Sequence, residues 1–292
     1  MRRLLFLLAL FPMTATAHEL AAPGAMPGWT WDGWIVGPLI LLLALFLTGW
    51  SVLRARMGKG AHMLDWGGWL FLAGWLILAG ALMSPLHQLG ERSFAAHMVE
   101  HELLMLAAAP LLVLARPLVP MLWAFPGPAR RWLGRAGRSA LVLPLWKGVT
   151  GPLPATLLQA AALWLWHAPA LFDRALASSA WHATQHLCFL VAGLIFWTAM
   201  LARSTPRGVA ALCLFATSLV SGALGALMAF ALSPWYPRYA ALGMAPFGLS
   251  PVEDQQLAGL LMWVPGGLIH AGAALLLLHG MVRQEESIAH AG

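Results

Sequence analysis

Seven long apolar runs follow the N-terminal region of this chain, and they constrain its fold more than any other feature. They cover residues 34–53, 66–83, 95–115, 153–166, 182–201, 209–232 and 256–278. A helix needs about 20 apolar residues to cross a bilayer core of roughly 30 Å. Because 60% of the residues are hydrophobic and only 10% are charged, we predict an all-α polytopic membrane protein with a bundle of seven transmembrane helices.

The N-terminal residues differ from these runs. Two arginines precede a short apolar stretch at 4–11, and the small-residue pattern Ala15-Thr16-Ala17 follows. This arrangement is typical of a cleavable secretory signal peptide. We therefore expect a signal peptide at 1–17, with an uncleaved anchor as the alternative, and a single transmembrane domain at 18–292.

The basic residues indicate the orientation in the membrane. If the mature N-terminus lies outside, twelve of the 17 lysines and arginines fall in loops on the inner side and three fall in outer loops. This asymmetry follows the positive-inside rule. We expect a bacterial cytoplasmic (inner) membrane protein with a periplasmic N-terminus and a cytoplasmic C-terminus.

The densest basic segment is the predicted cytoplasmic loop near 117–150. Aromatic and aliphatic residues such as Trp132, Leu141 and Trp146 interrupt its arginines. Such a pattern favours contact with anionic membrane lipid, although a solvated basic loop is an equal alternative. The net charge of +6 therefore needs no nucleic-acid partner.

Two pairs of histidines stand where apolar runs begin. His97 and His101 open the third run, and His182 and His186 open the fifth. A spacing of four residues places two side chains on one face of a helix, and ionisable residues within membrane spans are more often functional than not. We predict that both pairs bind a metal ion, provided that the third and fifth spans are neighbours.

Two further residues extend this candidate site. His167 ends the fourth run, and Met105 continues the His97 and His101 stripe at i+8. Imidazole and thioether ligands suit copper better than magnesium or calcium, so copper is the expected metal. The predicted ligands are His97, His101, His182, His186, His167 and Met105.

Simpler interpretations exist for single residues. A buried methionine such as Met105 more often packs in the core. A lone histidine near a helix end usually reaches to the lipid headgroups. We interpret His87, in a short loop, in this way, and the same explanation is available for His167. A nearby carboxylate would orient a ligand histidine, and Glu100 and Glu102 are candidates.

Other uses of the histidines stay open. Histidines on different helices could ligate a haem in a membrane redox protein, but here both pairs crowd one leaflet. The pattern H-x-x-E-H at His97, Glu100 and His101 also matches inverted zinc peptidases, although four convergent histidines would fill the position that water needs. A transporter would need polar groups at mid-depth, where His270 is the chief example.

The chain also resembles a known family through a series of ordered motifs between about 65 and 278. They are SPL at 84–86, AHMVEHELLM at 96–105, APLLVLARP at 109–117, WHAPALFD at 166–173, HATQHLCF at 182–189 and DQQLAGLLMW at 254–263. In these motifs the chain is similar to the multi-span CtaG family of cytochrome c oxidase assembly factors.

This resemblance implies a process and a set of residues. It implies a non-enzymatic factor that helps deliver copper to a terminal haem-copper oxidase, with an oxidase subunit and a soluble or membrane copper chaperone as partners. Asp254 would be an acidic position of the outer face, and Gln185 stands where family members often have Glu. The implied copper ligands are His97, His101, His167, His182 and His186.

Overall fold

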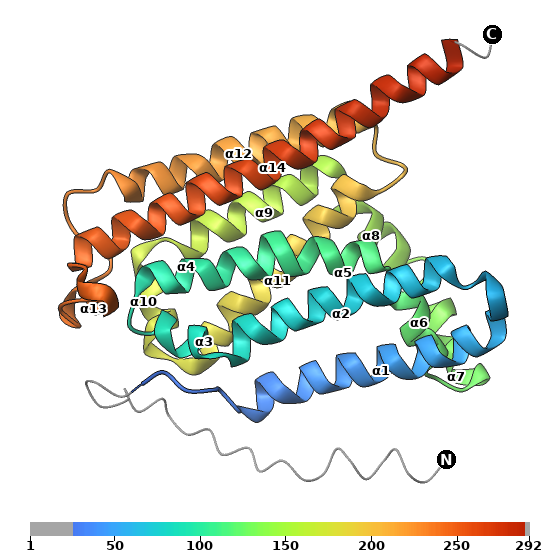
Figure 1. The fold of residues 1–292 in the computed structure, drawn as a ribbon, viewed down its shortest axis with the longest axis horizontal. Coiled ribbons are helices and arrows are strands. Elements are labelled where there is room, and N and C mark those ends of the chain that lie inside the picture. Colours follow the sequence, from blue (N-terminus) through green and yellow to red (C-terminus); the bar gives the residue numbers. More distant parts are fainter. Residues whose placement is uncertain (1–25, 290–292) are drawn as a thin grey trace.

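The computed structural model describes residues 26–289, so the expected signal peptide at 1–17 lies outside the described residues. Helices form the described part of the chain and no strand occurs in it (Figure 1). Six helices are long and apolar enough to cross a membrane, and a bent pair makes a possible seventh. The prediction of an all-α membrane bundle is confirmed. The long helices are α1 (Gly33–Met57), α2 (His62–Met83), α4 (Phe94–Glu102) continued by α5 (Ala109–Ala115), α11 (Ser179–Leu201), α12 (Arg207–Ala229) and α14 (Pro251–Ala289).

The fourth predicted span is bent rather than straight. The predicted run at 153–166 forms α9 (Pro152–Trp166), and α10 (Pro169–Ala177), which the prediction did not include, follows it at an angle of 72°. Pro169 opens α10 without a backbone N–H, and Ala168 before it has an extended conformation, as residues before proline prefer. The 15 residues of α9 span only about 22 Å, so the chain turns sideways before it has crossed the bilayer core.

The third span contains a π-helical turn, η2 (Leu103–Ala108), between α4 and α5. Pro110 lacks the N–H that would bond to the carbonyl of Leu106, and its ring would collide with that carbonyl in a regular helix. The turn is stabilised from α11, where the Trp197 indole N–H donates to the Met105 carbonyl at 2.9 Å. The α-helical register that relates His101 to Met105 is therefore broken.

Short helices gather at the two ends of the bundle (Figure 1). At one end, α3 (Pro85–Gly90), α10, α13 (Pro237–Ala241) and η3 (Pro246–Gly248) surround the first turns of α4, α11 and α14; we call it the histidine end. At the other end are η1 (Gly58–Gly60), α6 (Leu118–Trp123), α7 (Gly127–Ala136) and α8 (Val142–Val149); we call it the basic end. The basic segment near 117–150 forms α6 to α8, and neither α7 nor α8 has a buried residue.

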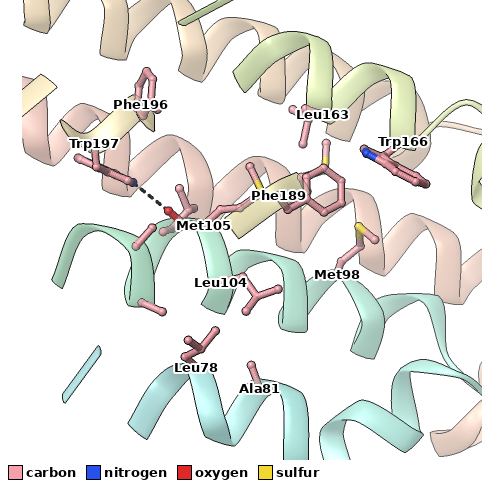
Figure 2. Packing of buried hydrophobic residues seen from close by; sticks show 14 of the residues in the cluster. Leu78, Ala81, Met98, Leu104, Met105, Leu163, Trp166, Phe189, Phe196 and Trp197 are labelled. Carbon is pink, nitrogen blue, oxygen red and sulfur yellow. Dashed lines mark hydrogen bonds between the residues drawn. The ribbon is translucent and has the colours of Figure 1, made fainter. Parts of the chain in front are cut away.

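The apolar core lies between the two ends, where the third span crosses the middle of the bundle (Figure 2). Leu104 is buried between Leu78 of α2 and Phe189 of α11. On the opposite side of the bundle, the backbones of α12 and α14 touch at Gly225 and Gly259. A Cβ atom added at Gly225 would lie only 2.8 Å from the Gly259 carbonyl oxygen, so no larger residue fits there. Small residues permit such close helix contacts in membranes. This packing fixes α14, which carries polar residues of both sites described below.

Candidate metal centre

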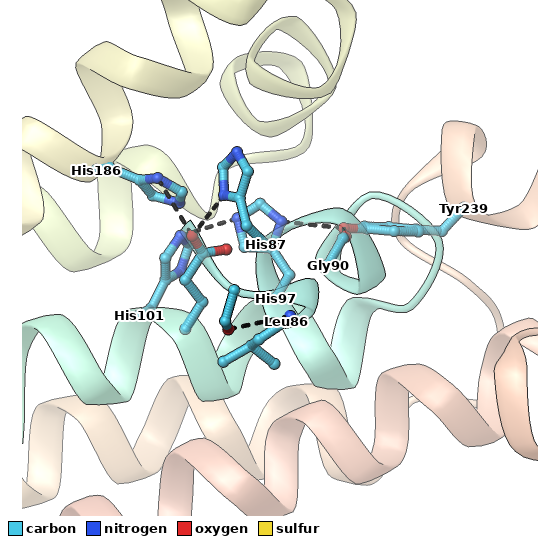
Figure 3. Close-up of polar contacts among 9 residues, drawn as sticks. Leu86, His87, Gly90, His97, His101, His186 and Tyr239 are labelled. Atoms are coloured by element: carbon cyan, nitrogen blue, oxygen red, sulfur yellow. Dashed lines mark hydrogen bonds and ion pairs between the residues drawn. The ribbon is translucent and has the colours of Figure 1, made fainter. Parts of the chain in front are cut away.

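Five imidazoles from α3, α4 and α11 meet at the histidine end, and Figure 3 shows those of His87, His97, His101 and His186. Neighbouring ring centroids lie 4.3–5.7 Å apart, and none of the five residues is more than 6% exposed. The third and fifth spans are therefore adjacent, and their paired histidines converge as the spacing predicted. The histidine cluster consists of His87, His97, His101, His182 and His186.

The nitrogen positions come close to those that one ion requires. Nitrogens bound at about 2.0–2.1 Å to one ion lie roughly 2.8–4.2 Å apart, depending on the angle at the metal. The Nε2 atoms of His97 and His101 are 2.8 Å apart, and ligand atoms of His97, His182 and His186 all lie within 4.8 Å of one another. Small side-chain rotations would place these nitrogens around a single ion.

His87 is the main correction to the sequence interpretation. It does not reach to headgroups: it is 1% exposed, stacks on the His182 ring and hydrogen-bonds through Nδ1 to Glu100 Oε1 at 2.7 Å. The segment that carries it is the helix α3 and not a loop. The Ser84 hydroxyl caps the N-terminus of this helix by accepting from the Leu86 N–H. Serine followed by proline is a sequence signal for a helix start, and this signal could have identified α3.

Glu100 lies beneath the cluster, where it orients the His87 ring and comes close to the His186 ring. Its side chain is fully buried, and its Oε1 atom is 2.7 Å from His87 Nδ1 and 3.7 Å from His186 Nδ1. The Nε2 atoms of both histidines are buried without a hydrogen-bond partner in the described part of the chain. A carboxylate that holds one nitrogen leaves the other available to a metal.

The same carboxylate affects the protonation of His87. Burial lowers the pKa of the His87 imidazole, but the charge of Glu100 and the hydrogen bond to it outweigh burial, so the pKa of His87 is raised. At a given pH, a larger fraction of His87 is therefore protonated than of an ordinary imidazole, and a metal that binds His87 must displace this proton.

Tyr239 of α13 fixes the tautomer of His97. The Tyr239 hydroxyl donates to the Gly90 carbonyl at 2.5 Å, and burial raises the pKa of this hydroxyl well above its ordinary value, so it stays protonated. Its oxygen must therefore accept from His97 Nδ1–H, which is 3.1 Å away. The lone pair of His97 then lies on Nε2, the atom that faces His101.

Asp254 of α14 holds the start of the helix that carries both His97 and His101. Its carboxylate accepts from the Phe94 N–H at 2.6 Å, the Ser93 hydroxyl at 2.7 Å and the Ala95 N–H at 3.3 Å. An acceptor at a helix N-terminus satisfies N–H groups that have no partner within the helix. Asp254 is thus a buried cap at the histidine end, directly under the cluster.

His167 lies beside the cluster at the bend between α9 and α10. Its ring centroid is 6.0 Å from that of His101, its Nδ1–H donates to the Leu163 carbonyl at 2.7 Å and its Nε2 is 3.3 Å from Met98 Sδ. The Tyr236 hydroxyl donates to the His167 carbonyl and so supports the bend. Sequence reasoning selected Met105 as the thioether, whereas the structure places Met98 next to a histidine.

Met105 lies away from the cluster because of the π-helical turn. Its side chain joins the apolar core and faces a separate small cavity between α9, α12 and α14.

Comparison with known proteins gives one match. A family model described as cytochrome c oxidase caa3 assembly factor (Caa3_CtaG) matches residues 44–284. The matched range contains the whole histidine cluster together with Glu100, Tyr239 and Asp254. No curated protein and no solved structure matches the chain.

Proposed function

This chain belongs to the family of cytochrome c oxidase caa3 assembly factors, and we propose that it serves this assembly as a non-enzymatic copper-binding protein. In this proposal the histidine cluster receives copper and helps deliver it to a terminal haem-copper oxidase. The observation that carries the proposal is the convergence of five buried imidazoles from three separate segments. Burying so many polar rings in a membrane protein is costly unless they bind something.

The donor atoms favour copper over other metals. Imidazole nitrogens bind copper(II) more tightly than they bind other divalent ions of the first transition series, and thioethers favour copper(I). The pair formed by His167 and Met98 adds one such thioether at the edge of the cluster. The site can therefore hold copper in either oxidation state with a modest change of ligands.

The geometry supports neither haem binding nor hydrolysis. Facing rings of the cluster are 4.3–5.7 Å apart, which leaves no gap for a porphyrin between them. In the H-x-x-E-H pattern, a hydrolase would need Glu100 as a free base beside a metal-bound water. Here Glu100 is held by His87, and the surrounding histidines supply enough donors to fill the coordination sphere.

Release would proceed by exchange of ligands. The cluster has five imidazoles, whereas copper uses about four ligands or fewer in such sites, so a partner can replace one imidazole while the others retain the ion. Copper would come from a chaperone and pass to an oxidase subunit. The excess of basic residues at the basic end favours a periplasmic histidine end in a bacterial inner membrane.

Oxidase composition in cells tests this proposal. In a strain whose only copy carries His97→Ala and His101→Ala, we expect an oxidase that retains haem and has lost copper. His62→Ala, which changes an exposed histidine at the basic end, is the matched control. Normal copper content and oxidase activity in the double variant would refute the proposal.

A further inference from the structure

A second polar site lies deeper in the bundle and shares no residue with the histidine cluster. It is a cavity of about 20 Å³ between the third span, α9, α12 and α14, which is room for about one water molecule or one ion. Glu102 lies about 12 Å along the third span from its start at Phe94, so the site is near mid-depth. The deep cavity is lined by Glu102, Met105, Gln159, Thr217, Ser221 and His270, together with apolar side chains.

Several hydrogen-bond acceptors in the deep cavity have no donor. Glu102 Oε2, Gln159 Oε1 and His270 Nε2 are buried and have no hydrogen-bond partner in the described part of the chain. Three acceptors without a donor are costly at this depth.

The hydroxyl and imidazole hydrogens of three lining residues are used within their own helices. The Thr217 hydroxyl donates to the Cys213 carbonyl and the Ser221 hydroxyl to the Ser218 carbonyl. His270 Nδ1–H donates to the Gly266 carbonyl at 2.7 Å, which leaves the lone pair on Nε2. The buried atoms of the cavity that lack a partner are acceptors, and they suit a ligand that is a donor or a cation.

Charge favours a cation of single charge. Glu102 is the one carboxylate that lines the cavity, and no lysine or arginine lines it. A methyl group on Gly266 would lie 3.4 Å from Glu102 Oε2, so the carboxylate packs against the turn of α14 that positions His270. A monovalent ion on one carboxylate gives a neutral site, whereas a divalent ion would leave a net charge in the hydrocarbon region.

The donor types then identify the ion. His270 supplies an imidazole nitrogen, and the π-helical turn brings the Met105 thioether to the same cavity. Nitrogen and thioether donors suit copper(I) better than sodium or potassium. We propose that the deep cavity binds one copper(I) ion as a second site, separate from the histidine cluster. The choice of copper as the ion available to the protein rests on the proposed function.

Anaerobic copper(I) titration against a chelator, with the full chain in detergent, tests this second site. We expect two ions for the wild type, and one ion for a variant with alanine at the four paired histidines (97, 101, 182 and 186). We also expect one ion for His270→Ala, and at least a tenfold weaker second ion for the conservative Glu102→Gln. His279→Ala, an exposed histidine further along α14, should bind two ions like the wild type.

X-ray absorption gives a second readout that does not depend on stoichiometry. In the variant that lacks the four paired histidines, the remaining copper should show a sulfur ligand, and Met105→Leu should remove it while preserving the volume of the core. If His270→Ala and Glu102→Gln bind as many ions as His279→Ala, or if no sulfur ligand is seen, the cavity holds water only and the inference is wrong. Loss of all copper from the four-histidine variant would overturn the second site alone, whereas full copper binding by that variant would overturn the proposed function of the cluster.

Discussion

The histidine cluster and the deep cavity contain similar side chains, but the hydrogen-bond partners of these side chains differ. In the cluster, hydrogen bonds to Nδ1 fix the orientation of two rings: Glu100 bonds to His87, and Tyr239 bonds to His97. In the deep cavity, His270 donates its hydrogen bond to a carbonyl of its own helix and stacks on Trp197. Within the described residues, the Glu102 Oε2 atom has no hydrogen-bond partner. The difference indicates that rings of the cluster are oriented by protein groups alone, whereas polar groups of the deep cavity would gain partners only from the ligand that we propose.

One helix links the two regions. α14 begins with Asp254 under the cluster and carries His270 at the deep cavity about four turns later. Changes at the start of α14 should therefore affect both sites, whereas changes at α13 should affect the cluster alone.

The largest effect is expected from Asp254→Ala. It removes the cap of α4 and leaves two backbone N–H groups and the Ser93 hydroxyl without their buried acceptor. We expect a loss of about 2–4 kcal/mol in the free energy of unfolding, seen as a lower Tm in detergent, and weaker copper binding at both sites. His279→Ala, at an exposed position far along the same helix, is the control. If both variants unfold at the same temperature, Asp254 does not support the cluster.

A smaller and more local effect is expected from Tyr239→Phe. Without the hydroxyl, the proton on His97 Nδ1 has no acceptor and the tautomer with a lone pair on Nε2 is no longer favoured. Changing such a supporting partner typically weakens metal binding about 10–100-fold, and copper titration would measure this change. Copper in the deep cavity should be unaffected.

Tyr236→Phe is the matched control, because its hydroxyl bonds to the His167 carbonyl and not to the cluster. An equal loss of copper affinity in Tyr236→Phe and Tyr239→Phe would show that α13 acts through packing and not through the tautomer of His97.

The smallest effect is expected from Met98→Leu. Its thioether is 3.3 Å from His167 Nε2 at the edge of the cluster, so its loss should weaken copper(I) binding by a few fold and leave copper(II) binding unchanged. Parallel titrations in the two oxidation states would measure the difference. Equal weakening in both states would assign Met98 to packing.

The sequence was sufficient for features that depend on local repeats. Apolar runs of helical length predicted the spans, because hydropathy is a property of consecutive residues. The spacing of four residues predicted that His97 and His101, and likewise His182 and His186, share a helix face. Both predictions needed no knowledge of which helices touch.

Features that depend on distant contacts could not be predicted in this way. Tyr239 reaches His97 across 142 positions, and Asp254 reaches Phe94 across 160. His87 joins the cluster only because α3 folds back against α4. Met105 was predicted to continue the stripe of His97 and His101, whereas it lies in a π-helical turn near Pro110 and lines the deep cavity.

The central claim is that imidazoles from α4 and α11 share one copper ion. The most direct test is copper titration with X-ray absorption on the purified full chain and on single variants His97→Ala and His186→Ala, with His62→Ala as control. The account predicts that each single variant removes a nitrogen ligand from the same copper ion and lowers its affinity at least tenfold, whereas His62→Ala changes neither. Unchanged nitrogen coordination and affinity in both single variants would contradict the account.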